Sequence, residues 1–193
     1  MKSLLAVCAT FLLAATVPAA EMASPALPSA AAEVMPGLKV GVKAADFTLK
    51  NAAGQEVALS ELLKHGKVAL AFVRSADWCP FCKKQLQELQ ASLKDIQAAG
   101  IQLIAISYDS PETNTAAAAK LGLTFPLLSD TGSKVIEAYG IRNQEATGRG
   151  AGIPHPVLFL LDQQGVIRVK LMRDGYRTRP EPAEIIAGAK SFK

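Results

Sequence analysis

Two cysteines, Cys79 and Cys82, stand at a junction between two different hydrophobic patterns, and this junction constrains the fold most strongly. The segment before them, residues 68–73, is an uninterrupted apolar run with the length and Val/Phe content of a buried strand. After them, apolar residues recur at steps of three and four over residues 86–96, which predicts an amphipathic helix ending at Gly100. The sequence therefore predicts a central strand that leads into a helix, with both sulfurs at the helix N-terminus.

A helix N-terminus is a favourable place for a reactive thiol. Its unpaired N–H groups and the positive end of the helix dipole favour a thiolate over a thiol. We expect Cys79, which opens the turn, to be the more exposed sulfur and to have a pKa below the ordinary thiol value of about 8.5. We expect Cys82, in the first helical turn, to face back toward Cys79 and to be shielded. A purely structural disulfide is the alternative, but closing so short a loop would stabilise the fold by only about 2 kcal/mol.

The rest of the chain alternates strand and helix patterns. A second buried strand is predicted at 101–107, so that the intervening helix completes a right-handed βαβ unit with parallel strands. Short apolar segments at 46–49 and 56–59 predict a hairpin before the central strand, and segments at 157–161 and 166–170 predict another near the C-terminus. The pattern therefore predicts an α/β domain with a mixed sheet.

The Trp-Cys-Pro-Phe-Cys motif of residues 78–82 resembles the active site of the thioredoxin superfamily, which lies at the same strand-to-helix junction. The opening of the domain, an Asp-Phe strand, a Gly turn and a Leu-Ser-Glu-Leu helix, is similar to the redoxin branch, which includes the alkyl hydroperoxide reductase/thiol-specific antioxidant proteins. The resemblance covers about residues 40 to 190. It implies a thioredoxin-like fold, a central mixed sheet flanked by helices, with an N-terminal hairpin extension. It also implies that Cys79 is the attacking nucleophile and Cys82 the resolving thiol.

A Gly-Ile-Pro tripeptide before a predicted strand is a second match to the superfamily, in which a cis proline lies opposite the Cys-x-x-Cys. By this resemblance Pro154 is the cis proline, and the backbone of Ile153 pairs with a substrate chain beside Trp78. An ordinary trans proline at the start of a strand is the alternative. His155 and Asp77 are close enough in sequence to the expected site to be candidate modulators of the thiolate. A surface histidine between two prolines is an equally good interpretation of His155.

The chain departs from both families at particular positions. Thioredoxins carry a buried acid six residues before the first cysteine, where this chain has Val73. Peroxiredoxins carry a hydroxyl that helps to position the peroxide, where this chain has Ala76; Ser75 is one residue out of register. Peroxiredoxins also carry an arginine at the start of the strand that corresponds to residues 157–161, and this chain does not. The chain therefore combines a redoxin body with a dithiol site, and we rank peroxidase activity second.

Three functions of different classes are consistent with these residues. The first is a thiol–disulfide oxidoreductase, in which Cys79 attacks a disulfide of a partner protein and Cys82 resolves the mixed disulfide, with an unidentified electron donor or acceptor. The alternative is a peroxiredoxin-like thiol peroxidase with antioxidant activity, in which Cys79 becomes a sulfenic acid that condenses with Cys82. Neither enzyme needs a cofactor. The second alternative is a copper or zinc carrier that uses Cys79, Cys82 and His155.

The N-terminal region predicts export. Residues 1–20 have the layout of a secretory signal peptide, with Lys2, an apolar run and small residues before Glu21. Residues 21–39 are rich in Ala, Pro and Ser and predict a flexible linker, which leaves 40–193 as the redoxin domain. The apolar run is too short for a membrane anchor, so we expect a periplasmic or secreted protein with no membrane span after cleavage. With a net charge of +4 and no Lys/Arg run interleaved with aromatics, nucleic acid is not an expected partner.

Cleavage of the signal peptide would remove Cys8 and leave Cys79 and Cys82 as the cysteines of the mature chain. We predict that exported protein shows two alkylated thiols by mass analysis, and that these become reactive only after reduction. A third labelled cysteine would contradict cleavage.

Overall fold

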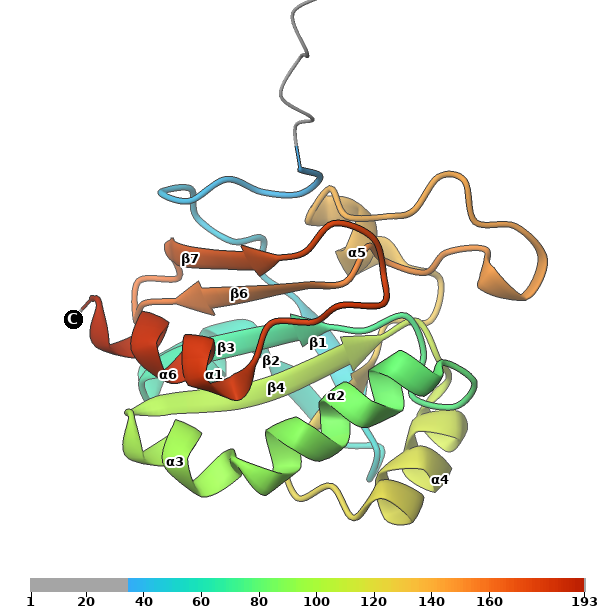
Figure 1. Ribbon diagram of the computed structural model, residues 1–193, viewed down its shortest axis with the longest axis horizontal. Coiled ribbons are helices and arrows are strands. Elements are labelled where there is room, and N and C mark those ends of the chain that lie inside the picture. The colour runs from blue at the N-terminus through green and yellow to red at the C-terminus, as the bar shows by residue number, and fades with distance from the viewer. Residues whose placement is uncertain (1–34, 193) are drawn as a thin grey trace, which may run out of the picture. The chain divides into compact units, whose positions relative to one another are not determined.

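The computed structural model describes residues 35–192, so the predicted signal peptide and most of the predicted linker lie outside the described residues. Within this range, seven strands form one mixed sheet in the order β2-β1-β5-β4-β3-β6-β7 (Figure 1). The strands are β1 (Thr48–Asn51), β2 (Glu56–Ala58), β3 (Lys67–Phe72), β4 (Ile101–Ser107), β5 (Leu127–Ser129), β6 (Val157–Leu161) and β7 (Ile167–Met172). The helices are α1 (Leu59–Lys64), α2 (Pro80–Ala91), α3 (Leu93–Ala98), α4 (Pro111–Leu121), α5 (Lys134–Ala138), the 3-10 helix η1 (Gly148–Gly150) and α6 (Pro182–Lys190).

The predicted α/β, thioredoxin-like fold is confirmed. Strand β3 lies between β4, to which it is parallel, and β6, to which it is antiparallel. Helices α2 and α3 connect β3 to β4, as expected for the βαβ unit. The predicted N-terminal hairpin is β1–β2, and β1 pairs antiparallel with β5, so the hairpin extends the sheet beyond β5. The predicted C-terminal hairpin is β6–β7.

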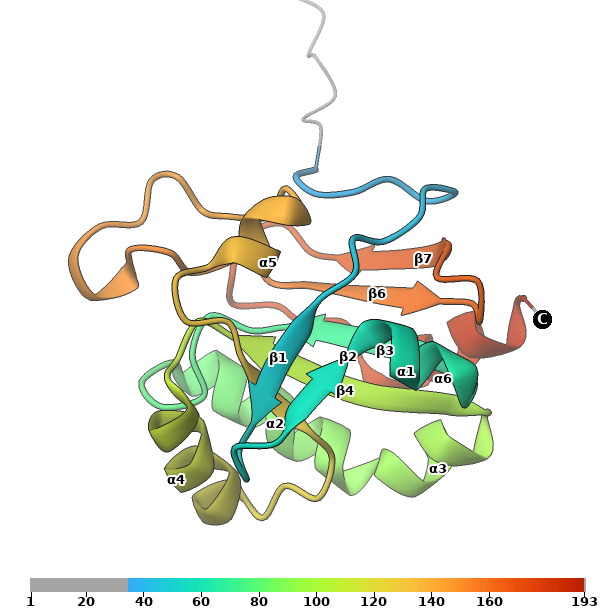
Figure 2. The ribbon, with the colours of Figure 1, turned by 180° about the vertical axis from the view of Figure 1, so that it is seen from behind.

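Both faces of the sheet are covered, which explains why β3 is apolar throughout. Successive side chains of β3 alternate between the faces: Ala69 and Ala71 belong to one buried cluster, and Leu70 and Phe72 to the other. Helices α2, α3 and α6 cover the first face (Figure 1), and α1 and α5 cover the second (Figure 2). The central strand is therefore fixed from both sides.

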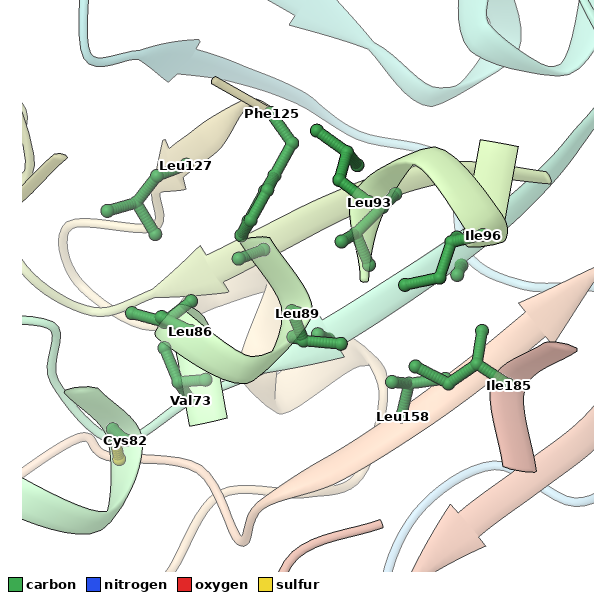
Figure 3. Packing of buried hydrophobic residues seen from close by; sticks show 14 of the residues in the cluster. Val73, Cys82, Leu86, Leu89, Leu93, Ile96, Phe125, Leu127, Leu158 and Ile185 are labelled. Carbon is green, nitrogen blue, oxygen red and sulfur yellow. The ribbon is translucent and has the colours of Figure 1, made fainter. Parts of the chain in front are cut away.

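The first cluster holds the cysteine-bearing helix against the sheet. Helix α2 projects Cys82, Leu86 and Leu89 into this cluster (Figure 3). There they lie with Val73, directly after β3, and Leu158 of β6. The single helix that the sequence predicted as far as Gly100 is instead interrupted at Ser92, whose backbone angles (φ −97°, ψ 6°) are not helical. The apolar stripe continues into α3 across this break, which is why the periodicity did not reveal it.

The domain begins before residue 40, and the predicted linker boundary at residue 39 was therefore too late. The N–H of Leu38 donates to the carbonyl of Tyr139 at 3.0 Å, and its side chain packs against the second cluster. Lys170 Nζ donates to the carbonyls of Met35 at 3.2 Å and Gly37 at 3.3 Å. Composition alone could not place this boundary, because one apolar side chain and a few backbone contacts hold the segment. Within residues 35–192, no helix is long and apolar enough to span a membrane.

We predict that Gly37→Ala destabilises the fold more than Gly41→Ala. Both glycines have a positive φ, +102° and +90°, so each substitution introduces backbone strain of about 1–2 kcal/mol. A Cβ at Gly37 would also lie 2.5 Å from Cγ2 of Ile141, whereas one at Gly41 would meet no atom within 4 Å. The contact should add about 1–3 kcal/mol to the loss. Urea denaturation measures both free energies of unfolding, and equal losses would contradict the packing of this segment.

Candidate active site

Cys79 and Cys82 lie at the C-terminal end of the central strand, where the sequence placed them. Cys79 is the N-cap of α2, and its Sγ accepts a hydrogen bond from the N–H of Cys82 at 3.3 Å. Pro80 occupies the first helical position, where its missing N–H costs nothing. Neither Cys79 nor Cys82 is part of a disulfide in this structure, and both side chains are buried, with 1% and 0% of the residue surface exposed. The expectation that Cys79 is an exposed sulfur is therefore wrong.

The two thiols titrate as a pair, and the first negative charge is on Cys82. The hydrogen bond from the Cys79 thiol, together with the backbone of Ser75 and the Arg179 guanidinium, lowers the pKa of Cys82 to about 6, against the effect of its burial. The same thiol–thiolate hydrogen bond, followed by burial, raises the pKa of Cys79. The prediction of a lowered pKa for Cys79 is therefore wrong in the resting pair. The N–H of Cys82 does lower it, but the neighbouring thiolate outweighs that effect.

A buried carboxylate holds the loop before Cys79. Asp109, two residues after β4, accepts hydrogen bonds from Ser75 Oγ at 2.9 Å and from the N–H of Ala76 at 2.8 Å. Ser75 Oγ in turn accepts from the N–H of Asp77 at 3.1 Å. Burial is the main cause that raises the pKa of Asp109. The parallel pairing of β3 with β4 brings the two strand ends together, so Asp109 shapes the loop although it does not contact either sulfur.

The Trp78 side chain forms a half-buried aromatic surface beside the pair. Its Nε1 donates to Tyr108 Oη at 3.0 Å, and Tyr108 Oη donates to the carbonyl of Arg149 at 2.6 Å. The guanidinium groups of Arg74 and Arg149 lie 5.3 and 5.5 Å from the Trp78 ring centroid. Asp77, a predicted modulator, pairs with Arg149 at 2.8 Å. Its charge is therefore balanced by Arg149.

The structure does not place Ile153 and Pro154 as the resemblance implied. The structure has no cis peptide bond among residues 35–192, so the bond before Pro154 is trans. Ile153 is buried; its N–H donates to the carbonyl of Gly150 at 3.1 Å, and its carbonyl accepts from Asn143 at 2.9 Å. Pro154 is also buried, and it forms an antiparallel bridge with Arg142. Because its own chain already uses both backbone groups of Ile153, that residue is not available to pair with a substrate strand.

His155 does not join the cysteines. Its backbone N–H donates to the carbonyl of Ile141 at 2.6 Å, and burial lowers the pKa of its imidazole. Over residues 35–192, no three His, Cys, Asp or Glu side chains are grouped closely enough to bind a metal ion. The arrangement of Cys79, Cys82 and His155 required for a copper or zinc carrier is therefore not present in this part of the chain.

Sequence reasoning missed one residue that contacts the pair. Nη2 of Arg179 lies 3.5 Å from Sγ of Cys82, although the two residues are 97 positions apart. Arg179 belongs to the basic stretch of residues 168–179, whose pattern predicts a strand with a solvated face. The spacing of its residues does not indicate a contact with the cysteines. The contact depends on how the chain returns from β7 to α6.

A fold of the thioredoxin type with a thiol pair at the start of α2 defines a redoxin, and comparisons with known proteins are consistent with this class. Residues 40–170 match the AhpC/TSA family model. The chain is 32% identical over 151 residues to chloroplastic peroxiredoxin Q of Sedum lineare, covering 78% of each protein. It is 33% identical over 146 residues to alkyl hydroperoxide reductase E of Mycobacterium tuberculosis, covering 75% of this chain and 92% of that protein. This chain belongs to the AhpC/TSA family, and it is an oxidoreductase of the redoxin class.

Two solved structures add to this comparison. A peroxidoxin from Mycobacterium tuberculosis has the same fold, with a TM-score of 0.72, 23% identity and coverage of 81% of this chain and 99% of that chain. A candidate protein disulfide isomerase from Bacteroides thetaiotaomicron is 29% identical, with a TM-score of 0.58 and coverage of 81% and 89%.

We predict that Asp109→Ala lowers the free energy of unfolding by about 1–3 kcal/mol, because it leaves the N–H of Ala76 and the hydroxyl of Ser75 without their buried acceptor. The losses in Asp109→Ala and Ser75→Ala should not be additive, since the two side chains share one hydrogen bond. Urea denaturation of both single variants and the double variant measures the coupling. Asp95→Ala, at an exposed position of α3, is the control. Additive losses would show that Asp109 does not act through Ser75.

Proposed function

We propose that this protein is a thiol peroxidase, in which Cys79 reduces a hydroperoxide and Cys82 resolves the product. The observation that carries the proposal is the buried Cys79–Cys82 pair at the start of α2, in which the N–H of Cys82 bonds to Sγ of Cys79, in a chain of the AhpC/TSA family. The lowered pKa of Cys82 agrees with it. The identity with a peroxiredoxin Q and an alkyl hydroperoxide reductase supports the peroxidase over protein disulfide exchange, which the sequence alone had favoured. The partners are then a hydroperoxide and a thiol reductant.

The shared proton gives each sulfur a role in the reaction. When the proton moves from Cys79 to the Cys82 thiolate, Cys79 becomes the nucleophile and Cys82 has acted as its base. Cys79 attacks the terminal peroxide oxygen, the O–O bond breaks, and the released alkoxide or hydroxide takes a proton from solvent. Cys82, deprotonated again, attacks the sulfur of the Cys79 sulfenic acid, whose hydroxide leaves as water after protonation. Two thiols and one peroxide thus give one disulfide, one alcohol or water, and one further water.

The surroundings of the pair differ from the peroxiredoxin pattern. Ala76 supplies no hydroxyl, and the hydroxyl of Ser75 is engaged with Asp109. Arg179 is the cation that touches the pair, and it comes from the segment between β7 and α6. The peroxide would therefore be oriented by groups other than those of the peroxiredoxin motif, and we expect slower peroxide reduction than that motif supports.

Thiol–disulfide exchange is the second candidate, and two observations favour it. The two sulfurs are already adjacent, so Cys82 could resolve a mixed disulfide without unfolding of α2. The candidate disulfide isomerase from Bacteroides thetaiotaomicron is also 29% identical to this chain. The same pair would then carry two electrons between protein partners.

We also propose export to the periplasm or beyond the cell. The support is the pattern of residues 1–20, a basic start, an apolar run and small residues at the predicted cleavage site.

Trp78, the one tryptophan of the sequence, precedes Cys79 and provides a signal for the proposed reaction. We predict that hydrogen peroxide or an alkyl hydroperoxide changes its fluorescence in the reduced protein, and that peroxide is consumed with a thiol reductant. Cys79→Ser should abolish consumption, and Cys82→Ser should accumulate a sulfenic acid on Cys79 that dimedone traps.

Insulin reduction provides the opposing measurement for the same variants. If insulin is reduced rapidly, peroxide is hardly consumed, and Cys82→Ser traps partner proteins instead of dimedone, the protein is a disulfide oxidoreductase and the peroxidase proposal is wrong.

A further inference from the structure

A segment from the C-terminal part of the domain closes over the thiol pair. Residues 173–180, here called the covering segment, connect β7 to α6 and bend toward the loop before α2 (Figure 1). The Tyr176 ring packs edge-on against the Phe81 ring, with centroids 5.8 Å apart. The guanidinium of Arg74 lies 4.2 Å from the Tyr176 ring centroid. Together with Arg179 on Cys82, these contacts tie the covering segment to the active-site loop and helix.

Closure of the covering segment restricts access to the sulfurs, so a reactant reaches them only when the segment moves aside transiently. Cys79 is 1% exposed and Cys82 is 0% exposed, whereas a reacting atom must approach to about 3–3.5 Å. The core beneath the sulfurs is close-packed and continuous with α2 and the sheet. The covering segment is the part that can move at least cost, because residues 174–178 are exposed to solvent.

Arg179 connects the covering segment to the charge on the pair. Its Nη1 donates to the carbonyls of Tyr176 and, at 3.3 Å, Thr178, and thereby holds the turn of its own segment. Its Nη2 donates to Cys82 Sγ, and its Nε is buried without a hydrogen-bond partner among residues 35–192. Burying a guanidinium with an unpaired donor is unfavourable unless an opposite charge lies nearby. The Cys82 sulfur, whose pKa is lowered to about 6, is the group in contact with Arg179 that can carry this charge.

We propose that Arg179 is a catalytic residue that stabilises the negative charge on Cys82, and that this charge in turn keeps the covering segment closed. Loss of the charge when the disulfide forms would release the segment. This inference deepens the proposed function, from which it takes only the identity of the oxidant.

Formation of the Cys79–Cys82 disulfide removes the negative charge from Cys82. In the reduced pair, Cys82 is a thiolate facing Arg179. When Cys82 attacks the sulfenic acid of Cys79, an S–S bond forms, the S–O bond breaks, and hydroxide leaves with one proton as water. The disulfide is neutral, so Arg179 loses its counter-charge. An open covering segment would then expose Phe81 and the disulfide to the reductant that restores both thiols.

The first test measures the thiolate directly. Arg179→Gln keeps hydrogen-bond donors for the carbonyls of Tyr176 and Thr178 but removes the charge, and it should raise the midpoint of thiolate absorbance by about 1–3 pH units. Arg179→Lys should restore most of the shift. Arg177→Gln, which removes an exposed charge from the same segment, is the control and should leave the midpoint unchanged. The other groups that act on Cys82 are Cys79 and the backbone of Ser75, while Asp109 faces Ser75, and all remain unchanged in these variants.

The second test follows opening in the unmodified protein. Protein oxidised with diamide, and pre-reduced protein freed of reductant under nitrogen, are digested briefly with trypsin, and cleavage after Arg177 is measured by mass. We expect cleavage about tenfold faster in the oxidised form, corresponding to loss of one charge-assisted hydrogen bond. Cys82→Ser, which cannot carry the charge, should be cleaved at the fast rate without any oxidant.

Either of two results would overturn the proposal: an unchanged thiolate midpoint in Arg179→Gln, or equal cleavage of the reduced and oxidised forms. Neither test uses peroxide, so each outcome is independent of whether the protein is a peroxidase.

Discussion

The chemistry proposed for this domain depends on two buried sulfurs, each of which shifts the pKa of the other. Burying a thiolate in an apolar cluster is unfavourable unless hydrogen bonds and charge compensate for the lost water. Here the compensation comes from the Cys79 thiol, the backbone of Ser75 and the Arg179 guanidinium. The fold supplies each of these from a different element: the helix start, the loop after β3 and the segment after β7. A thiolate at neutral pH is therefore a product of tertiary structure as well as of the helix N-terminus.

Asp109 and Arg179 act on this arrangement from different elements. Asp109 fixes the loop that aims Ser75 and Ala76, and it does so from the end of the strand parallel to β3. Arg179 reaches Cys82 from the segment between β7 and α6, much of which is exposed to solvent. The site thus has one side built on the sheet and one side formed by the covering segment, which we propose can move. Such a division suits an enzyme that must protect a thiolate and still admit both an oxidant and a reductant.

Local patterns predicted much of the fold, whereas contacts between distant segments escaped prediction. The apolar run of β3, the turn at Pro80 and the hairpins were readable because each depends on neighbours in the chain. Asp109 and Arg179 were not, because they reach Ser75 and Cys82 across 34 and 97 positions. The resemblance to thioredoxins gave a wrong prediction of a cis bond at Pro154. The segment before β6 is fixed instead by the hydrogen bond from Asn143 to Ile153 and by the bridge between Arg142 and Pro154. The prediction for the pKa of Cys79 was also wrong, because helix-end reasoning treats one thiol at a time and the two sulfurs are coupled.

The pH dependence of peroxide oxidation tests the shared proton most directly. The bimolecular rate constant for reduced protein and hydrogen peroxide can be followed through Trp78 fluorescence across the acidic and neutral range. Reaction requires that the pair has lost its first proton, so the rate should rise with pH, with a midpoint near the value of about 6 for Cys82, and then level off. A rate that keeps rising to a midpoint near the ordinary thiol value, about 8.5, would contradict a stabilised thiolate in this pair.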